Sequence, residues 1–403
     1  MGITLPDSAA TVIVNGRPFA GWLAFQVVQS FDKASGELTL RMSPQPGVPL
    51  PIMKGDKVQL LLGKRPVING YVMRIWGEHS ISSHVIQAQV RDKTQDLVDS
   101  TVGPKLNIDP PVRLSEVAQR TLSVMGLNDI SVIDKVNAEP FERGEKVSSE
   151  IDTRGFDFIE DWAKKRHSVL NTDGNGNLVI DQNKGEMLAG AKLHFGLPDD
   201  PMNNVIKSQF GVDDFDKHNS YAEAGQKSPN DRKHWESRPK SDPDAQAKTV
   251  SNRYGVAYDR SVRPQRRKHR RGGRGMQGRT PRESAKWRAN SMRAKSNEYV
   301  ATVAGFTTAL GEVWWPGKLV PVYDYWWEIS STLFLKEVEF GKDRTKGSIT
   351  QLRFGLEDSF KDQAGRSQAA GRTGGALPGD PGEKYDTVSP GDLGIDEAEV
   401  DRD

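Results

Sequence analysis

The first hundred residues alternate between short apolar patches and turn-forming residues. Turn formers such as Asn15-Gly16, Ser35-Gly36 and Asn69-Gly70 separate the patches, a pattern typical of short antiparallel strands. Strands at this spacing suit a small antiparallel barrel or sandwich. The predicted strands cover residues 11–14, 23–28, 37–42, 57–62, 69–75 and 83–90.

The next segment changes to helical spacing. Apolar positions recur every three or four residues over 112–125, and a second amphipathic pattern covers 156–163, so both are predicted to be helices. The Asp-Gly-Asn-Gly turn at 173–176 leads into a strand at 178–180. This region predicts a compact α+β unit.

Strand patterns return at 205–212 and are then interrupted. From about 225 to 280 the chain is rich in Lys, Arg, Ser, Pro, Asp and Gly, the composition of a loop or disordered arm. A helix over 283–296 leads back into strands. These later strands cover residues 299–303, 318–323, 326–330, 334–340 and 348–354.

The chain therefore divides into five regions, which for 403 residues fits roughly two or three domains. The fold class is mainly β with α+β parts. The two strand-rich regions look alike, which suggests a duplication. The regions are a first β unit (1–100), an α+β domain (101–190), a second β unit (191–225 and 296–360), a basic and partly flexible insertion ending in a helix (226–295), and an acidic flexible tail (361–403).

Composition removes several classes of function. The sequence contains no cysteine, which excludes disulfide scaffolds, iron–sulfur clusters, thiolate zinc sites and cysteine nucleophiles. No apolar run reaches the roughly 18 residues that a membrane span needs, and residues 1–10 lack the pattern of a secretory signal. We expect no membrane insertion.

The net charge of +2 hides a segregation along the chain. Between Arg260 and Lys295 the sequence has one acid, Glu283, whereas residues 380–403 are strongly acidic. The basic run resembles nucleic-acid-binding tracts but lacks interleaved aromatics, so a solvated loop or an arm that docks on an acidic partner stays open. The candidate partner-binding residues are Arg266, Arg267, Lys268, Arg270, Arg271 and Arg274.

Motifs for catalysis or metal binding are missing from the sequence. The seven histidines form no His-Glu-x-x-His pattern, and no phosphate-binding loop or serine elbow occurs. Asp173 begins a sequence like a calcium loop, but Leu178 stands where glycine is required and Lys184 where the bidentate glutamate is required. We expect no catalytic residue, no metal and no cofactor.

Large aromatic residues cluster near the end of the second β unit. Some must point outward from alternating strands, and exposed Trp and Tyr are typical of protein interfaces. Core packing explains at least half of them, and a carbohydrate or peptide groove lacks accompanying polar groups. The candidate interface aromatics are Trp314, Trp315, Tyr325, Trp326 and Trp327.

Three segments carry a resemblance to a known family. They are residues 91–99, residues 155–163 with the turn and strand at 176–180, and the run from Trp314 through Leu352. In order and spacing they resemble the baseplate hub proteins of Mu-like contractile-tailed phages, which are related in fold to the hub of T-even phages and to VgrG spikes.

This resemblance implies a fold and a function. The fold would contain two tail-tube-like antiparallel β-barrel domains, a small α+β domain and a peripheral insertion. Three chains would form a ring of six barrels that adapts the sixfold tail tube to the threefold central spike, with edge strands covered by neighbouring subunits. The implied place is the virion tail baseplate, after assembly in the host cytoplasm.

The resemblance also implies partners: a homotrimer, the central spike, the tail tube or tube-initiator protein, and baseplate wedge proteins, with the tape measure protein as a further candidate. The basic insertion departs from the compact family pattern, and we expect it to bind an acidic surface of a neighbouring component. Two other functions remain open: nucleic-acid binding through 260–295, and a fused cell-wall hydrolase, for which the chain offers no extra domain.

Overall fold

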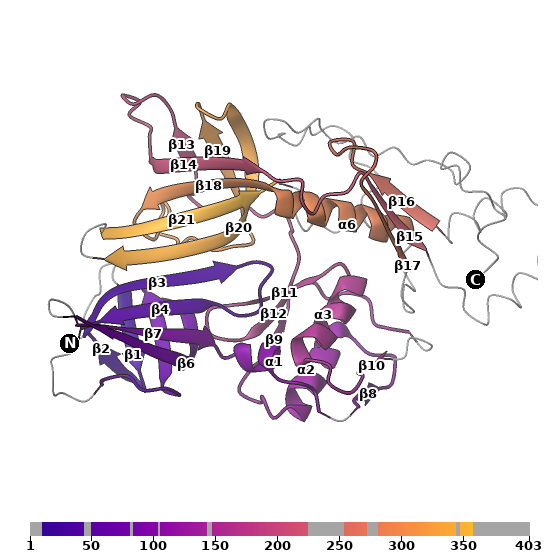
Figure 1. The fold of residues 1–403 in the computed structure, drawn as a ribbon, viewed down its shortest axis with the longest axis horizontal. Coiled ribbons are helices and arrows are strands. Elements are labelled where there is room, and N and C mark those ends of the chain that lie inside the picture. The colour runs from indigo at the N-terminus through magenta and orange to yellow at the C-terminus, as the bar shows by residue number, and fades with distance from the viewer. Residues whose placement is uncertain are drawn as a thin grey trace, which may run out of the picture.

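The computed structural model describes residues 10–43, 50–80, 84–103, 105–142, 147–224, 254–271, 281–343 and 347–357. Within them the fold is mainly β, as predicted, and a 13-stranded sheet runs through both strand-rich regions (Figure 1). The expected pair of separate barrels is not found in the described part of the chain. The two β units instead share one open sheet.

The first β unit forms one end of this sheet. Its strands pair antiparallel in the order β3-β4-β7-β6-β5-β1-β2, and the six predicted strands fall on β1 and β3–β7. The turn between β1 and β2 uses Asn15 and Gly16, both at positive φ, as a two-residue hairpin turn requires. The bounds are β1 (Ala10–Val14), β2 (Arg17–Phe19), β3 (Trp22–Ser30), β4 (Glu37–Met42), β5 (Lys57–Leu62), β6 (Arg65–His79) and β7 (His84–Asp92).

The middle region has a separate apolar core built from three helices and short strands. The two predicted helices are found, and each buries its apolar face in that core. The hairpin β11–β12 pairs through β12 with β9 in parallel. The bounds are α1 (Gln95–Asp99), β8 (Asn107–Ile108), α2 (Leu114–Val124), β9 (Val132–Asp134), β10 (Val147–Ser148), α3 (Gly155–Lys165), β11 (Val169–Thr172) and β12 (Leu178–Asp181).

The turn between β11 and β12 fastens the middle region to the first β unit. Just before it, Thr172 Oγ1 donates a hydrogen bond of 2.8 Å to Asp92 Oδ2. Burial raises the pKa of the Asp92 carboxyl to about 7. In the turn, Gly176 has a φ of +80° and lies so close to Asn69 and Asp92 that a Cβ would stand 2.8 Å from each. The two regions are therefore in tight contact here.

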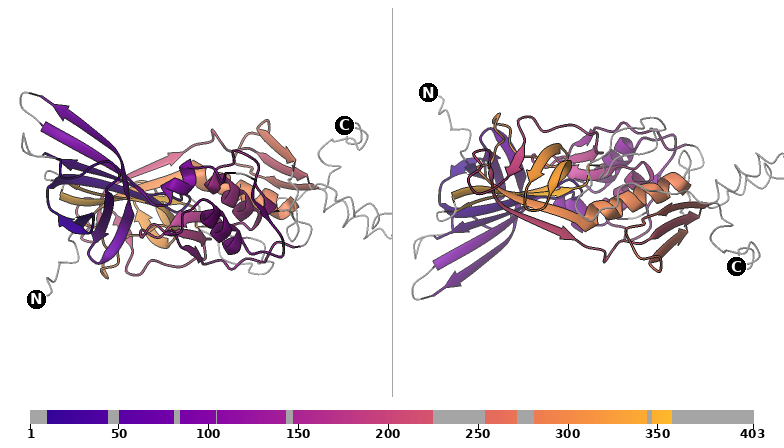
Figure 2. Two further views of the ribbon diagram at one scale, coloured as in Figure 1. Left: turned by 90° about the horizontal axis from the view of Figure 1, so that it is seen from below. Right: turned by 90° about the horizontal axis from the view of Figure 1, so that it is seen from above.

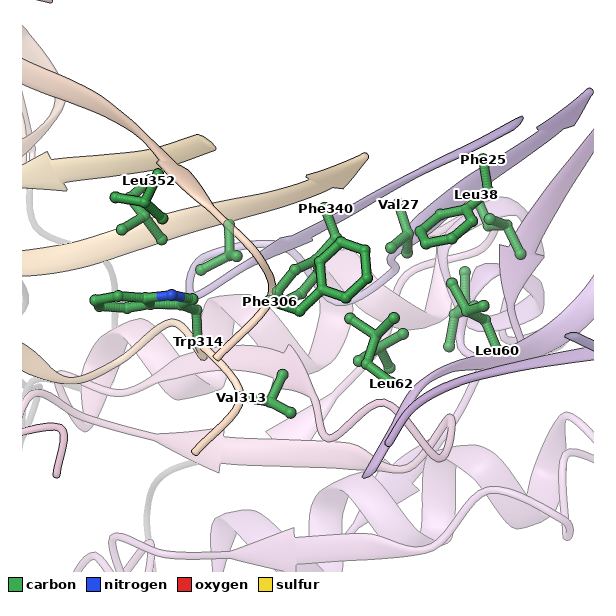
Figure 3. Close-up of a cluster of buried hydrophobic side chains, with 14 of the residues drawn as sticks. Phe25, Val27, Leu38, Leu60, Leu62, Phe306, Val313, Trp314, Phe340 and Leu352 are labelled. Atoms are coloured by element: carbon green, nitrogen blue, oxygen red, sulfur yellow. The ribbon is translucent and has the colours of Figure 1, made fainter. Parts of the chain in front are cut away.

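The second β unit completes the large sheet. Its strands run in the order β14-β18-β21-β20, with β19 and β13 continuing beyond the first part of β20. Its core and that of the first unit form one apolar cluster, in which Phe340 lies beside Phe306 and close to Val27 (Figure 3). The bounds are β13 (Leu193–Phe195), β14 (Val205–Val212), β18 (Asn297–Ala304), β19 (Leu319–Asp324), β20 (Ile329–Asp343) and β21 (Gly347–Gly355).

The described part of the basic insertion is folded, contrary to the expectation of a flexible arm through residue 280. Three strands in the order β16-β15-β17 pack against a helix, and this small sheet stands beside the second β unit (Figure 1). Tyr221, Ala257, Ala285 and Ala289 form its core. The bounds are β15 (Ser220–Ala224), β16 (Tyr254–Tyr258), β17 (Arg267–Arg271) and α6 (Pro281–Ser296).

Five strands of each β unit repeat in the same order. Strands β3, β4, β5, β6 and β7 of the first unit correspond to β14, β18, β19, β20 and β21 of the second, because both sets have the same neighbours. Both β6 and β20 are 15 residues long, and each pairs first with the preceding strand and then with the following one.

Bulges in the strand pairing show which individual residues of the two units correspond. The ladder of β6 with β7 skips Met73, and that of β20 with β21 skips Lys336. Likewise β3 skips Leu23 and β14 skips Ile206. Bulges are specific features of a strand, so their matching places align β3 with β14 and β6 with β20 residue by residue. The suspected duplication is therefore present in the pairing registers.

A junction between the two units explains why the first unit does not close on itself. The β3 edge pairs antiparallel with β20, from Ser30 opposite Glu337 to Phe25 opposite Lys342. This pairing uses the edge that the first unit would need to close a barrel. The sheet therefore continues from one unit into the next (Figure 1).

Candidate subunit interface

The structure offers surfaces rather than a chemical centre. Within the described residues there is no group of three or more His, Asp or Glu side chains that could hold a metal ion, and no described helix is long and apolar enough to span a membrane. Asp173 Oδ1 accepts the backbone N–H groups of Asn175 and Asn177. Its carboxylate thus builds the turn, which accounts for the sequence that resembles a calcium loop.

One candidate surface is the outer edge of β14. Within the described chain this strand pairs with β18 and has no ladder on its other side. It carries exposed apolar side chains, with Ile206 at 58% and Val212 at 52% exposure, and Phe215 just beyond it is 84% exposed. A long unpaired edge with apolar side chains is a template for pairing with another chain.

The second candidate surface is the far half of β6. The ladder of β6 with β5 ends at Tyr71, and from Arg74 to His79 the described structure pairs it with β7 alone. The hairpin projects from the body of the molecule, as the left view of Figure 2 shows. Met73 and Trp76 are 44% and 47% exposed. This hairpin therefore also presents an open edge with apolar side chains.

The junction inside the chain shows how such edges can be satisfied. On one face of the β3–β20 pair, Val27 lies opposite Phe340 and both are fully buried. On the other face, Lys33 Nζ forms an ion pair of 2.8 Å with Glu337 Oε2. The backbone N–H of Phe31 adds a hydrogen bond of 2.8 Å to the carbonyl of Lys336. An apolar face and a charged rim thus hold the two units together.

An exposed aromatic turn lies next to the β14 edge. Tyr325, Trp326 and Trp327 connect β19 to β20, and their exposed fractions are 50%, 57% and 39%. The Trp327 ring lies 5.8 Å from that of Phe210 in β14. The patch is therefore continuous with that edge.

Buried polar contacts hold this turn in place. Asp324 is fully buried, and its Oδ1 accepts the backbone N–H groups of Trp326 and Trp327. Tyr299 donates its hydroxyl to Asp324 Oδ2 at 2.8 Å. Burial and the nearby Asp324 carboxylate raise the pKa of Tyr299 above its ordinary value. The aromatic side chains are thus presented by a fixed backbone.

Comparison with known proteins places these surfaces in context. Residues 9–92 match the family of the Mu phage baseplate assembly protein GpP-like, N-terminal. The baseplate hub protein gp44 of Escherichia phage Mu is 23% identical over 362 residues, which cover 88% of this chain and 89% of that protein. The chain is a relative of the Mu-like baseplate hub proteins.

Solved structures show the same fold. A tail protein from Neisseria meningitidis has a TM-score of 0.71 at 18% identity, covering 87% of this chain and 97% of that one. The 43 kDa tail protein of prophage MuSo2 from Shewanella oneidensis has a TM-score of 0.67 at 22% identity, covering 87% and 98%. The match of fold thus extends over both β units and the middle region.

These relatives confirm the resemblance seen in the sequence. The matched proteins are structural components of phage tails and baseplates. The fused hydrolase is not supported by any of them. Nucleic-acid binding through 260–295 likewise finds no support in these comparisons.

The candidate aromatic residues of the chain separate into two groups. Trp314 is 4% exposed and belongs to the shared core (Figure 3), so it stabilises the fold rather than forming a surface. Trp315 is partly buried, with the Arg65 guanidinium 4.2 Å from its ring centre. Tyr325, Trp326 and Trp327 remain as candidates for an interface.

The candidate basic residues of the chain lie mostly on an edge strand. Arg267, Lys268, Arg270 and Arg271 are in β17, and Arg266 directly precedes it and donates from Nη2 to the Phe215 carbonyl. Arg267 and Lys268 are exposed. Arg274 lies outside the described residues.

The sequence patterns did not predict the two open strand edges. The exposed Met73 and Trp76 on β6, and Ile206 and Val212 on β14, lie in strands that read as ordinary half-buried strands. Only the strand order, which joins residues about 300 positions apart, shows which edges stay open.

Proposed function

We propose that this chain forms a homotrimeric ring in the baseplate hub and adapts a sixfold tail tube to a threefold central spike. The observation that carries the proposal is the residue-level repeat of the two β units. Each chain supplies two equivalent units, so three chains supply six. A closed ring of six similar units can match a sixfold partner on one face.

The parts that are not repeated support the threefold side of this proposal. The middle region, with its own core, and the small basic sheet each occur once per chain. A ring of three chains would carry three copies of each. The same assembly would therefore have a sixfold layer and a threefold layer, which is what an adaptor between tube and spike requires.

The candidate partners can be assigned to surfaces. We propose that the aromatic turn at 325–327 contacts a neighbouring subunit or tube component, because exposed Trp and Tyr on a fixed backbone anchor protein interfaces. We propose that the basic sheet, with exposed Arg267 and Lys268, binds an acidic surface of a baseplate wedge or spike component. Charge reversal at both positions should weaken that contact and leave the ring intact.

The native mass of the purified chain tests the proposal. Light scattering at low and high salt should give three times the 44.7 kDa of one chain, and electron microscopy should show rings with a central channel. A monomer or a closed dimer at both salts, in the presence as well as the absence of the spike protein, would contradict it. Salt-sensitive retention of DNA by the full chain would instead favour the nucleic-acid alternative.

A further inference from the structure

We infer that the ring is closed by one repeated contact, in which β14 of one copy pairs antiparallel with residues 74–79 of β6 of the next copy, in the register of the β3–β20 junction. This inference rests on the proposed ring and adds to it the strands, the register and the side chains of the contact.

Equivalence of the units identifies the strands. The observed junction joins β3 of the first unit to the far half of β20 of the second. The counterpart of β3 is β14 and that of β20 is β6, and these are the two open edges described above. A ring with six similar junctions therefore alternates the contact inside the chain with a contact between β14 and β6 of two copies.

One chain cannot make the second contact by itself. In the order of the large sheet, six strands lie between β14 and β6, so with seven spacings of about 4.8 Å the two strands are roughly 34 Å apart along the sheet. The contact is head-to-tail, because two different edges meet. Repetition of a head-to-tail contact gives a closed ring when the rotation closes, and an open filament when it does not.

The matching bulges assign each residue of β6 and β14 a counterpart in β20 and β3, and this assignment gives the register of the inferred contact. Met73 corresponds to Lys336 and Ile206 to Leu23, so the residue opposite each position follows from the observed β3–β20 pairs. The resulting pairs between copies are Asp213 with Arg74, Val212 with Ile75, Gly211 with Trp76, Phe210 with Gly77, Gln209 with Glu78, and Ser208 with His79.

The apolar residues agree with this register. Val212 lies opposite Ile75 on the face that corresponds to the buried core face of the β3–β20 junction. On the same face Phe210 lies over Gly77, which leaves room for the ring. Phe210 and Ile75 already pack at the margin of the shared core, so the contact would continue that core into the next copy. Cross-strand apolar pairs of this kind stabilise a sheet.

The charged side chains also agree with this register. Compared with the observed junction, the acidic and the basic side chain have exchanged strands. In the observed junction the basic Lys33 pairs with the acidic Glu337 at 2.8 Å. The counterpart of Lys33 is Asp216 and that of Glu337 is Arg74, so the acid and the base have changed sides. Asp213 lies directly opposite Arg74 and adds a second carboxylate. Both junctions therefore contain one complementary pair at the same place.

The absence of cysteine from the natural sequence allows a direct test of the register. The double variant Val212→Cys with Ile75→Cys should form disulfides between copies under mild oxidation, because directly paired residues in antiparallel strands stand within disulfide reach. The products should be linked dimers and trimers on a non-reducing gel. The matched control is Val212→Cys with His79→Cys, which lies on the same strand face but about 13 Å out of register.

The outcomes of this crosslinking test distinguish a failure of the inferred register from a failure of the proposed ring. Selective linking of the 212–75 pair supports the register. A native trimer in which neither pair links, or in which both link equally, overturns the register and leaves the ring proposal standing. A chain that stays monomeric and does not link at high concentration overturns both. Circular dichroism of the reduced variants checks that the fold is retained.

Discussion

The two β units share five strands in the same order and two matching bulges, but one of their corresponding edges is covered and the other is open. The edge of β3 is covered within the chain, and Phe25 and Val27 there are 3% and 0% exposed. The edge of β14 is open, and Val212 there is 52% exposed. A duplicated unit thus uses one copy of its edge for intramolecular folding and, in the proposed ring, the other for assembly.

The exchange of acidic and basic residues between the two junctions indicates why a strand of one junction does not pair with the partner strand of the other. If β14 met β20 of another copy, Asp213 and Asp216 would face Glu337, and like charges in contact disfavour pairing. If β14 meets β6, the same acids face Arg74. The side chains at one position therefore select an alternating order of units around the ring.

The largest effect is expected inside the covered junction. Phe340 is fully buried against Phe306, so Phe340→Ala should lower the free energy of unfolding by about 3–5 kcal/mol. Phe210→Ala in the open edge should lower it by only about 1 kcal/mol and should dissociate the ring. Denaturant unfolding and native mass measure the two effects. Equal losses of folding stability would show that the edges are used in the same way.

The charge pair of the open junction gives the next effect. Arg74→Glu should convert the trimer to monomers, while its exposed position keeps the change in folding stability within about 0.5 kcal/mol. The triple variant Arg74→Glu, Asp213→Ser, Asp216→Lys recreates the residues found at Glu337, Ser30 and Lys33 and should restore the trimer. Native mass of both variants decides, and failure of the triple variant to recover would argue against the translated register.

The turn that fastens the middle region to the first unit gives a smaller effect. Gly176→Ala should lower the free energy of unfolding by about 2–3 kcal/mol, because it adds a close contact with Asn69 and Asp92 to the strain of a positive φ. Gly16→Ala is the matched control, since Gly16 has the same φ of +80° and nothing within 4 Å of its Cβ position. Thermal unfolding should show the smaller loss for that control.

The buried Asp92 makes stability depend on pH. Burial raises its pKa from 3.8 to about 7, so between these values the folded protein holds a proton that the unfolded chain has lost. The free energy of unfolding should therefore fall as pH rises from about 4 to 7, by up to about 1.4 kcal/mol per pH unit. Asp92→Asn should remove this slope, whereas Asp109→Asn at an exposed position should keep it. Urea titrations at several pH values measure both.

The aromatic turn should give the smallest effect on folding. Trp326 is 57% exposed, so Trp326→Ala should change the free energy of unfolding by no more than about 0.5 kcal/mol. Its effect should appear in the native mass or in the binding of a tube component. Trp314→Ala is the buried comparison and should unfold the protein far more readily. A large loss of folding stability at Trp326 would show that the turn is part of the core.

Local patterns in the sequence were sufficient for most individual elements. The strands of the first unit and both helices of the middle region follow from apolar periodicity and turn residues, and residues 91–99 and 155–163 support the family resemblance. The predicted strand at 326–330 is wrong at its start, because Asp324 binds the N–H groups of Trp326 and Trp327 in a turn. A buried carboxylate that accepts backbone N–H groups leaves no periodic signal.

Contacts between distant segments could not be predicted. The pairing of β3 with β20 joins residues about 300 positions apart, and nothing local marks either strand as a partner of the other. The same holds for β17, whose basic residues resemble a flexible arm until this strand pairs in parallel with β15, which packs against α6. Without these pairings the open edges, and with them the candidate interface, could not be recognised.

The central claim is that two equivalent units per chain build one ring through head-to-tail contacts. The native mass of the 212–75 cysteine variant after oxidation tests it most directly. The account predicts a covalent species of three times 44.7 kDa that returns to single chains on reduction. A product that stops at a linked dimer would contradict it, whereas no linked product beside an intact trimer would contradict only the inferred register.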